Sequence, residues 1–443
     1  MKNLDNDIDR RIIIHALRGG YIMRRVVVTG IGVIAPSGIG IKDFWENSLS
    51  GKSYISSFDD FPEYDLKSRV VGRVRGFEPN RYGITKSDLE RMGRPTQLAI
   101  AAAQEAFSQA GIDPELHDKE NMGVCISNAI ADTPASEEQF LRLLKFYQKK
   151  DCCTKEELSQ LIDRNFYSKC SFNCISSELA AKYHINGQVF TMSTGCVGGI
   201  DAIGFAFESI RSGDMDWMLC GASEAPITLL TLASFDVIGA TSRKNIPPEK
   251  ASSPFDATRD GFVLSEGAGL VILEELEHAR ARKANILGEI LSYETNCNAW
   301  HMTSLPEDGE PIVRIMENAL KNADVKPEQI EYINAHGSST PQNDIFETAA
   351  YKKVFGKHAY EIPISANKSI MGHPLGAASA IEFVRSCLIL QNGKIPPTIN
   401  LEHPDEKCDL DYVPNVWREK NINYILSDAS GFSGIHSVIV MKK

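Results

Sequence analysis

Residues 188–213 read QVFTMSTGCVGGIDAIGFAFESIRSG and carry the pattern that decides the fold. An apolar, strand-like run ending at Met192 meets a glycine-rich turn. Apolar side chains then recur in steps of three and four, which is the spacing of one helix face, and Gly213 suits the C-terminal cap of that helix. The stretch therefore predicts a strand, a tight turn and a helix in direct succession.

The same alternation of strand and helix patterns extends along most of the chain and predicts a layered α/β fold. A second cycle begins after the basic segment EHARARKA, residues 277–284. We therefore expect two α/β halves, over residues 23–279 and 280–443, behind an N-terminal extension of residues 1–22. The charged, helix-periodic residues 136–170 interrupt the first half as an insertion.

Composition and charge narrow the function classes. The 443 residues include 47 Lys and Arg against 58 Asp and Glu, which gives a net charge of −11. Such a chain lacks the basic face that a general nucleic-acid binder needs. No apolar run approaches the ~20 residues of a membrane-spanning helix, and the acidic start MKNLDNDID is unlike a secretory signal. We therefore expect neither nucleic acid nor a membrane as partner, and an acidic partner would need a local basic patch.

The cysteines indicate the compartment. Ten cysteines are scattered along a large chain without a signal-like start, which is typical of a reducing cytosol rather than of a disulfide framework. No neighbouring pair has the C-x2-C spacing of a zinc site. We therefore expect a cytoplasmic protein without a bound metal.

Cys196 is the first candidate for chemistry. It lies on the predicted strand-to-helix turn, after Gly195 and before Gly198 and Gly199. Unpaired N–H groups and the helix dipole at such a turn stabilise a thiolate, and the same N–H groups can bind the oxyanion of an acyl-transfer intermediate. Cys196 is therefore a candidate nucleophile, and a buried structural cysteine in a glycine-rich turn is the alternative.

Two histidines and a lysine strengthen the functional interpretation. YINAHGSSTPQNDIFE places His336 at the end of one predicted strand, and ISANKSIMGHPLGAASAIE places Lys368 and His373 at the end of the next. Sites in α/β folds form at the edge where strands give way to loops. A cysteine with two neutral imidazoles suits acyl-thioester chemistry, because Cys196 can carry the acyl group while the histidines donate hydrogen bonds to a thioester carbonyl.

Several separated motifs together resemble the β-ketoacyl synthases of the thiolase-like fold, from about residue 23 to residue 443. They are VVVTGIGVIAPSG, STGC, SPFDATRDGFVLSEGAG, NAHGSSTPQND, NKSIMGHPLGA, PPTINLEHPD and SGFSG. STGC followed by GIDAIG is most similar to the ketosynthase-alpha subunit of bacterial type II polyketide synthases. The resemblance implies two similar α/β halves packed as a five-layered α-β-α-β-α architecture.

The resemblance also implies an activity, the decarboxylative Claisen condensation of malonyl-acyl carrier protein with a Cys-bound acyl chain. Cys196 would accept the acyl group, while His336 and His373 would assist decarboxylation of the malonyl thioester and stabilise its enolate. The backbone N–H groups of Cys196 and Phe432 would form the oxyanion hole, and Phe432 would also gate the acyl tunnel.

Further roles follow from the same resemblance. Lys368 matches the family lysine that orders the site, and Glu347 matches its ion-pair partner. Ser338 and Thr340 match positions that hydrogen-bond the phosphopantetheine arm. No resident cofactor is implied, because the substrates travel on that arm of an acyl carrier protein.

The expected partners are an acyl carrier protein and a chain-length-factor paralogue, which would form a heterodimer with this chain. The alternative is a homodimeric β-ketoacyl-acyl carrier protein synthase of fatty-acid elongation. The ending GFSGIH, with Ser433 and His436 in place of the Gly and Asn of GFGGTN, weakens that alternative. A non-catalytic chain-length factor is disfavoured because Cys196 is present.

A basic cluster in this acidic chain is the candidate docking surface for the carrier protein. Its members are Lys67, Arg69, Arg73 and Arg75. The alternative interpretation of such a charge run is an ordinary solvated face.

Overall fold

The computed structural model describes residues 23–113, 121–148, 154–304 and 309–443. The predicted N-terminal extension lies outside these described residues. Within them, no helix combines the length and the apolar character needed to cross a membrane.

A mixed sheet runs through the molecule, and eleven of the strands in the described residues belong to it. Its order is β11-β10-β14-β15-β9-β1-β8-β7-β5-β6, and the short β2 pairs with β1. In chain order the strands are β1 Val26–Ala35, β2 Gly38–Ile39, β5 Met122–Ser127, β6 Val189–Met192, β7 Trp217–Glu224, β8 Gly267–Glu275, β9 Gly288–Cys297, β10 Tyr332–Asn334, β11 Ile364–Ser365, β14 Tyr424–Ser430 and β15 Ile435–Lys442.

The sheet consists of two halves with the same topology. In the first half β5 is parallel to β6 and β7, and β8 is antiparallel to β7 and β1. In the second half β10 is parallel to β11 and β14, and β15 is antiparallel to β14 and β9. The halves meet where β1 pairs with β9, with Val26 opposite Ile290. This repetition confirms the prediction of two similar α/β halves.

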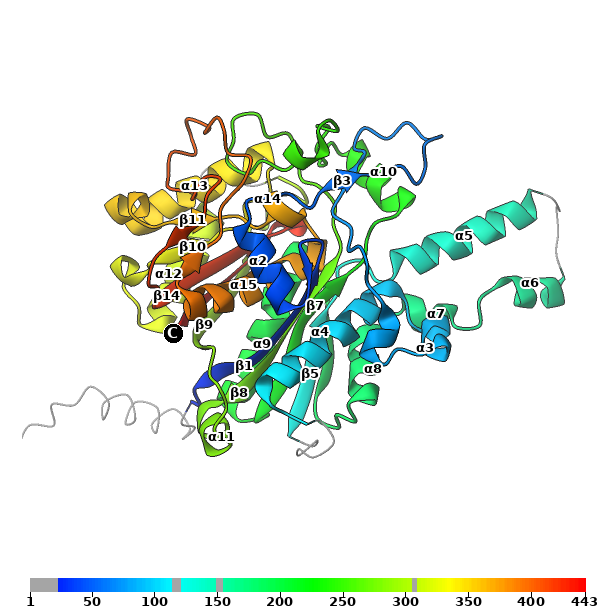
Figure 1. The fold of residues 1–443 in the computed structure, drawn as a ribbon, viewed down its shortest axis with the longest axis horizontal. Helices are drawn as coiled ribbons and strands as arrows, with labels where there is room; N and C mark the ends of the chain where they lie inside the picture. The colour runs from blue at the N-terminus through cyan, green and yellow to red at the C-terminus, as the bar shows by residue number, and fades with distance from the viewer. Residues whose placement is uncertain (1–22, 114–120, 149–153, 305–308) are drawn as a thin grey trace, which may run out of the picture.

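The helices and the two halves of the sheet make up the five predicted layers (Figure 1). In order, these layers are the outer helices of the first half, the first half of the sheet, the central helices, the second half of the sheet, and the outer helices of the second half. Helices α9 and α15 pack against each other and contact strands of both halves. On the outer faces, α4 and α8 contact the first half, while α12 contacts the second half and packs against α13. The bounds are α4 Arg94–Ala110, α8 Cys174–Lys182, α9 Gly198–Ser212, α12 Glu310–Ala323, α13 Pro341–Phe355 and α15 Ala378–Asn392.

Alternation along the strands fills the spaces between these layers. Val271 and Leu273 of β8 belong to the central core around α9 and α15, whereas Leu270 and Ile272 belong to the core beneath α4. Successive side chains of a strand point to opposite faces, so a strand covered by helices on both faces is apolar at every position. The same alternation occurs in β14 and β15, whose outward side chains pack beneath α12 and α13.

The predicted insertion forms helices that extend away from the body, α5 Thr133–Tyr147 and α6 Lys155–Leu161, followed by α7 Phe166–Cys170 (Figure 1). The smaller elements surround the two halves. They are α2 Ile41–Leu49, β3 Ser56–Ser57, β4 Val70–Val71, α3 Lys86–Arg91, α10 Leu229–Val237, α11 Leu276–Ala281, α14 Lys368–Met371, β12 Lys394–Ile395 and β13 Arg418–Glu419.

The 188–213 stretch folds as its pattern predicts. Strand β6 ends at Met192, and α9 begins after a 3-10 turn over Gly195–Val197. Gly213 ends α9 with a φ of 92°, the left-handed conformation in which glycine is favoured. The strand, the turn and the helix are therefore confirmed.

Candidate active site

The main candidates lie at equivalent positions of the two halves. Cys196 lies between β6 and α9, and His373 lies between β11 and α15, the corresponding elements of the second half. Lys368 begins α14 on the same connection, and His336 follows β10. The repeated topology therefore brings segments from far apart in the chain to one place.

The N-termini of α9 and α15 abut at the centre of the molecule. Ser379 Oγ donates a hydrogen bond to the carbonyl oxygen of Cys196 at 3.2 Å and accepts one from the N–H of Ile200 at 3.1 Å. A Cβ at Gly199 would lie 2.4 Å from the backbone nitrogen of Ala380, so only glycine fits this approach. The contact fixes the turn of Cys196 against the segment that follows His373.

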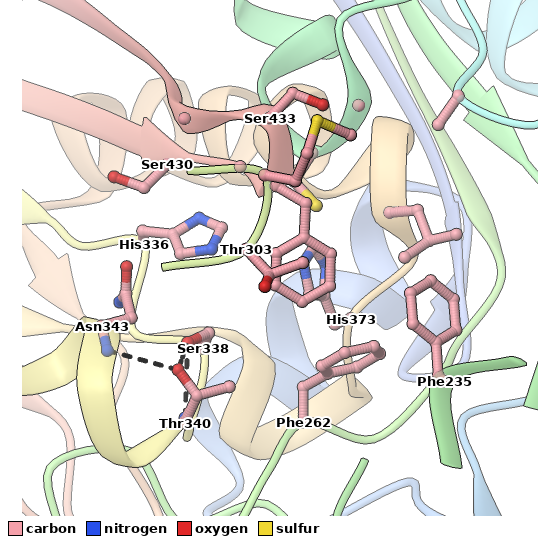
Figure 2. Close-up of a pocket in the computed structure, with 18 of the residues that line it drawn as sticks. Phe235, Phe262, Thr303, His336, Ser338, Thr340, Asn343, His373, Ser430 and Ser433 are labelled. Carbon is pink, nitrogen blue, oxygen red and sulfur yellow. Dashed lines mark hydrogen bonds between the residues drawn. The ribbon is translucent and has the colours of Figure 1, made fainter. Parts of the chain in front are cut away.

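These segments surround a cavity of about 240 Å³. Figure 2 shows Ser338, Thr340 and Asn343 together below His336, and Phe235 and Phe262 together beside His373. The walls thus combine a polar side with an aromatic side, as small-molecule pockets usually do. The predicted site residues that line it are Cys196, His336, Ser338, Thr340, His373 and Phe432.

Two opposing influences act on the pKa of the Cys196 thiol. Burial raises its pKa to about 11, although the charge of Lys368 and the backbone N–H of Phe432 lower it. The expectation that the turn stabilises a thiolate stays a prediction: its N–H groups lower the pKa of the thiol, while desolvation raises that pKa by more. Acylation requires the thiol proton to leave, and the cavity holds two imidazoles that can accept it.

Two N–H groups converge on the sulfur. The backbone N–H groups of Phe432 and of Cys196 itself both lower the pKa of the thiol. Phe432 lies in a short turn, Phe432–Gly434, whose Ser433 N–H donates to the Met302 carbonyl at 2.6 Å. The same two N–H groups were expected to form the oxyanion hole, and that role stays a prediction supported by this placement.

The two histidines are neutral neighbours. Their rings lie 5.4 Å apart at 81°. Burial lowers the pKa of His336 well below its ordinary value, and the positive charge of Lys368 lowers it further. The same two causes lower the pKa of His373, whose Nδ1 has no hydrogen-bond partner within the part of the chain that the structure describes. Both rings are therefore neutral at neutral pH, and each can donate or accept a hydrogen bond.

Lys368 pairs with Glu382, so the expected Lys368–Glu347 ion pair is wrong. Nζ of Lys368 lies 2.6 Å from Oε1 of Glu382 and donates to the carbonyl oxygen of His336 at 2.6 Å. It also lies 3.4 Å from Nδ1 of the same histidine. The partner comes from α15, which packs between the two halves, whereas Glu347 lies on the outer helix α13.

Glu347 acts on the turn of His336 instead. Its carboxylate accepts hydrogen bonds from the backbone N–H of His336 at 2.6 Å and of Gly337 at 3.0 Å. Asn343 Nδ2 donates to it at 3.0 Å. Glu347 therefore holds the backbone that positions the imidazole, and it does not line the cavity.

Ser338 and Thr340 lie together on the polar wall. Their hydroxyl oxygens are 2.8 Å apart, and Thr340 also caps α13 by accepting from the N–H of Asn343 at 3.4 Å. Both hydroxyls can hydrogen-bond an amide-bearing arm in the cavity, and their binding of such an arm stays a prediction.

The basic cluster lies outside the cavity, on the segment around β4. Arg73 pairs with Asp60 at 2.7 Å, Arg75 donates to Ser56 Oγ at 3.0 Å, and Arg69 bonds to the carbonyl of Tyr64. Lys67 is exposed.

The apolar residues of this segment, Phe58, Leu66 and Val71, pack in one cluster with Phe262 and Phe432 of the cavity wall. Docking at this cluster stays a prediction, supported by its place beside the cavity.

Two buried carboxyls near the site were missed by sequence reasoning. Glu382 is the lone acid in the apolar helix run AASAIEFV, a signal that could have identified it. Glu224 ends β7, and burial raises its pKa to about 8. It accepts hydrogen bonds from the N–H groups of Ala129 at 2.7 Å and Gly376 at 3.2 Å, which ties two walls of the cavity together.

No group of three or more potential metal ligands is present among the described residues.

The arrangement suits acyl transfer followed by carbanion chemistry. A thiol with two N–H groups beside it can take up an acyl group and stabilise the tetrahedral oxyanion. Two neutral imidazoles can stabilise negative charge that develops on a second thioester. Lys368 donates to the backbone carbonyl oxygen of His336, and burial together with the charge of Lys368 lowers the pKa of the His336 imidazole.

Comparison with known protein families gives matches to both halves. The N-terminal domain of beta-ketoacyl synthases matches residues 23–279, and the C-terminal domain of beta-ketoacyl synthases matches residues 287–402. The tetracenomycin polyketide synthase ketoacyl synthase alpha subunit of Streptomyces glaucescens is 40% identical over 420 residues, 95% of this chain and 97% of that protein. The 3-oxoacyl-[acyl-carrier-protein] synthase 2 of Coxiella burnetii is 38% identical over 424 residues, 95% of this chain and 99% of that protein.

Solved structures give the same result. A type II polyketide synthase acyl carrier protein in complex with its ketosynthase bound to the hexaketide provides a chain with a TM-score of 0.87 and 42% identity. The ishigamide ketosynthase/chain length factor provides one with a TM-score of 0.86 and 31% identity. Each match covers 95% of this chain and 100% of the other, so the similarity includes the cavity as well as the sheet.

Proposed function

The chain belongs to the beta-ketoacyl synthase family, whose members form carbon–carbon bonds by acyl transfer, and we propose that it is the ketosynthase subunit of a type II polyketide synthase. Family membership confirms the resemblance carried by the sequence motifs and the thiolase-like fold expected with it. The observation that carries the proposal is one cavity lined by the thiol of Cys196 and two neutral imidazoles.

The reaction would proceed in two stages at this cavity. First, the sulfur of Cys196 attacks the carbonyl of an acyl thioester while an imidazole takes the thiol proton. The C–S bond of the donor thioester then breaks, and its departing thiolate takes up that proton. Second, a malonyl thioester loses carbon dioxide, and the charge that develops on its thioester oxygen is stabilised by hydrogen bonds from His336 and His373. The resulting carbanion attacks the acyl-Cys196 carbonyl, while the N–H groups of Cys196 and Phe432 bind the oxyanion. The tetrahedral intermediate then collapses, the C–S bond to Cys196 breaks, and the freed thiolate takes up a proton.

The site imposes one condition on the histidines. A ring that donates to the enolate oxygen must be neutral beforehand, since a resident positive charge would bind the malonyl carboxylate and hinder its loss. Burial and Lys368 provide that condition, because both lower the pKa of His336 and His373.

We propose an acyl carrier protein as the substrate-bearing partner, with Ser338 and Thr340 binding its phosphopantetheine arm. We also propose a heterodimer with a chain-length-factor paralogue. The structural relatives include an acyl carrier protein in complex with its ketosynthase and a ketosynthase/chain length factor. A cytoplasmic location and the division of the chain at residue 279 stay predictions.

The second candidate function is a homodimeric 3-oxoacyl-acyl carrier protein synthase. The observation in its favour is the 38% identity to the Coxiella burnetii enzyme over nearly the whole of both chains. Co-expression with a paralogue that lacks the nucleophilic cysteine separates the two. Copurification of the pair supports the polyketide function, whereas a stable, active homodimer supports the alternative.

The test of the proposed chemistry compares the wild type with Cys196→Ala. Chain extension and carbon dioxide release are both measured with malonyl-acyl carrier protein. We expect Cys196→Ala to lose chain extension completely and to keep decarboxylation, because the two histidines remain. The matched control is Cys170→Ala, at a half-buried cysteine of α7 outside the cavity. Extension by Cys196→Ala would show that the covalent mechanism is wrong.

A further inference from the structure

Two carboxyls and one phenol form a buried cluster behind the turn that carries His336. Oη of Tyr351 lies 2.7 Å from Oε1 of Glu347 and 2.7 Å from Oδ1 of Asp428. All three side chains are buried. Asp428 lies on β14 and Tyr351 on α13, and neither lines the cavity.

The two contacts of the phenol require more protons than the phenol has. A hydroxyl donates one hydrogen bond, and an ionised carboxylate only accepts. With both carboxylates ionised, Tyr351 could satisfy one of them, and the other would set its negative oxygen against the lone pairs of the phenol. Two such charges would also lie side by side without water. At least one of the two carboxyls therefore carries a proton.

The surroundings of the two carboxyls decide which one is protonated. Glu347 accepts three N–H hydrogen bonds, from His336, Gly337 and Asn343, which stabilise an anion. Oδ2 of Asp428 is buried and meets no donor among the described residues, so an ionised Asp428 would leave a charged oxygen unsatisfied. Burial raises the pKa of Asp428 well above its ordinary value, and the charge of Glu347 raises it further.

We propose that Asp428 is a positioning residue that works as a neutral carboxylic acid. The carboxyl proton of Asp428 bonds to Oη of Tyr351, and the hydroxyl proton of Tyr351 bonds to the carboxylate of Glu347. Glu347 in turn fixes the backbone N–H groups of His336 and Gly337. The proposal deepens the proposed function and rests on it for its effect on activity. The proton on Asp428 can be observed without any activity.

The charged neighbours make ionisation of Asp428 unfavourable. Lys368 faces the cluster from α14, but its charge is already matched by Glu382 of α15, which itself raises the pKa of Asp428. The other titratable groups around the cluster are His336, Asp344 with its partner Arg259, Tyr412 and Arg385. A second negative charge beside Glu347 would therefore have no cation to balance it.

This arrangement gives a pH dependence with a definite sign. The pKa of Asp428 is higher in the folded protein than in the unfolded chain, where it is about 3.9. Between these two values the folded protein binds more protons, so the free energy of unfolding falls as the pH rises. As the pH rises through the folded pKa, the hold of Glu347 on the His336 turn weakens.

The experiment compares wild type with Asp428→Asn, Asp428→Leu and the control Asp214→Asn, an exposed acid just beyond α9. Infrared difference spectra are recorded across a pH titration, and kcat and KM for malonyl decarboxylation are measured over the same range. At neutral pH the wild type should show two C=O bands of protonated carboxyls, one from Glu224, whose pKa burial raises to about 8, and one from Asp428, which is the band under test. Asp428→Asn should lack that band, and Asp214→Asn should keep it.

The expected kinetics depend on whether the side chain at position 428 can still donate a hydrogen bond. Asp428→Asn keeps a neutral hydrogen-bond donor, so its kcat should stay within about threefold of wild type. We expect the kcat of the wild type to fall as the pH rises through the folded pKa of Asp428, and the kcat of Asp428→Asn should not show this fall. Asp428→Leu removes the donor, and its kcat should fall roughly 10- to 100-fold with KM unchanged, since the substrate contacts remain. Absence of the band in the wild type, or equal impairment in both Asp428 variants, would overturn the proposal. Should decarboxylation be undetectable in every variant, the proposed function fails, and the infrared band still decides the state of Asp428.

Discussion

At the scale of single residues, the ion pair of Lys368 and Glu382 controls the electrostatics of the site. Both side chains are buried, with Nζ and Oε1 2.6 Å apart. The lysine charge lowers the pKa of both histidines and opposes the burial that raises the pKa of Cys196. The carboxylate of Glu382 lets this charge exist in the interior at all, because an unpaired buried cation would lose its proton.

A double-mutant cycle tests this pair. We expect Lys368→Met and Glu382→Leu each to lower the free energy of unfolding by about 3–5 kcal/mol, because each leaves one buried charge without its partner. The double variant should regain most of that loss. It should stay inactive, because nothing then holds the carbonyl oxygen of His336. Urea unfolding and carbon dioxide release measure the two effects.

The matched cycle pairs Lys368→Met with Glu347→Gln. Glu347 makes no ion pair with Lys368 in the described residues, so its coupling energy should be clearly smaller. Equal coupling in the two cycles, or strict additivity in the first, would contradict the observed pairing.

At the scale of elements, the approach of α9 to α15 sets the position of the nucleophile. Backbone meets backbone at Gly199 and Ala380, and Ser379 bonds to the turn of Cys196 from the other helix. Each helix comes from a different half, so their contact at the centre joins the two catalytic segments.

Gly199→Ala tests this contact. The added methyl group would lie 2.4 Å from the backbone nitrogen of Ala380, and the two helices must separate to accept it. We expect a loss of about 1–3 kcal/mol in the free energy of unfolding together with slower acylation of Cys196. Urea unfolding and mass spectrometry of the acyl-enzyme check both. Ser212→Ala, at the exposed end of the same helix, is the control and should change neither quantity; an unaltered Gly199→Ala would mean that the approach is not tight.

At the scale of the whole molecule, the two edges of the sheet differ: one is covered by another backbone segment, and at the other no strand among the described residues pairs beyond β6. At β11 the N–H of Ile364 donates to the carbonyl of Asp411, which covers that edge. At β6 the sheet ends with Val189 and Phe190, which are 39% and 43% exposed. An open apolar edge strand is a template for pairing with another chain, and it is where the proposed partner subunit would bind.

A lysine at this edge tests the assembly. We expect Val189→Lys to shift the protein toward the monomer, because a charged side chain on an edge strand opposes pairing. Light scattering after gel filtration, with and without the co-expressed paralogue, measures the effect. Val416→Lys introduces the same change at another exposed valine, 67% exposed and outside the sheet. Equal assembly of the two variants would place the interface elsewhere.

The sequence by itself determined the features that depend on local contacts. Alternating strand and helix patterns predicted the layered halves, and the glycine-rich turn placed Cys196 at the start of α9. The histidines were predicted at strand ends because such ends recur at one edge of an α/β sheet. Periodicity and turn chemistry express interactions between residues a few positions apart, so one chain segment is enough to reveal them.

Only the tertiary structure decided the electrostatics. It assigned Lys368 to Glu382 rather than Glu347, raised the pKa of Cys196 through burial, and brought Asp428 to Glu347 from a strand 81 positions further on. Ion pairing and desolvation depend on which distant segments meet and on how much water their packing excludes. No sequence period records that meeting, because it is set by the packing of segments far apart in the chain, which for Lys368, Glu382, Glu347 and Asp428 all belong to the second half.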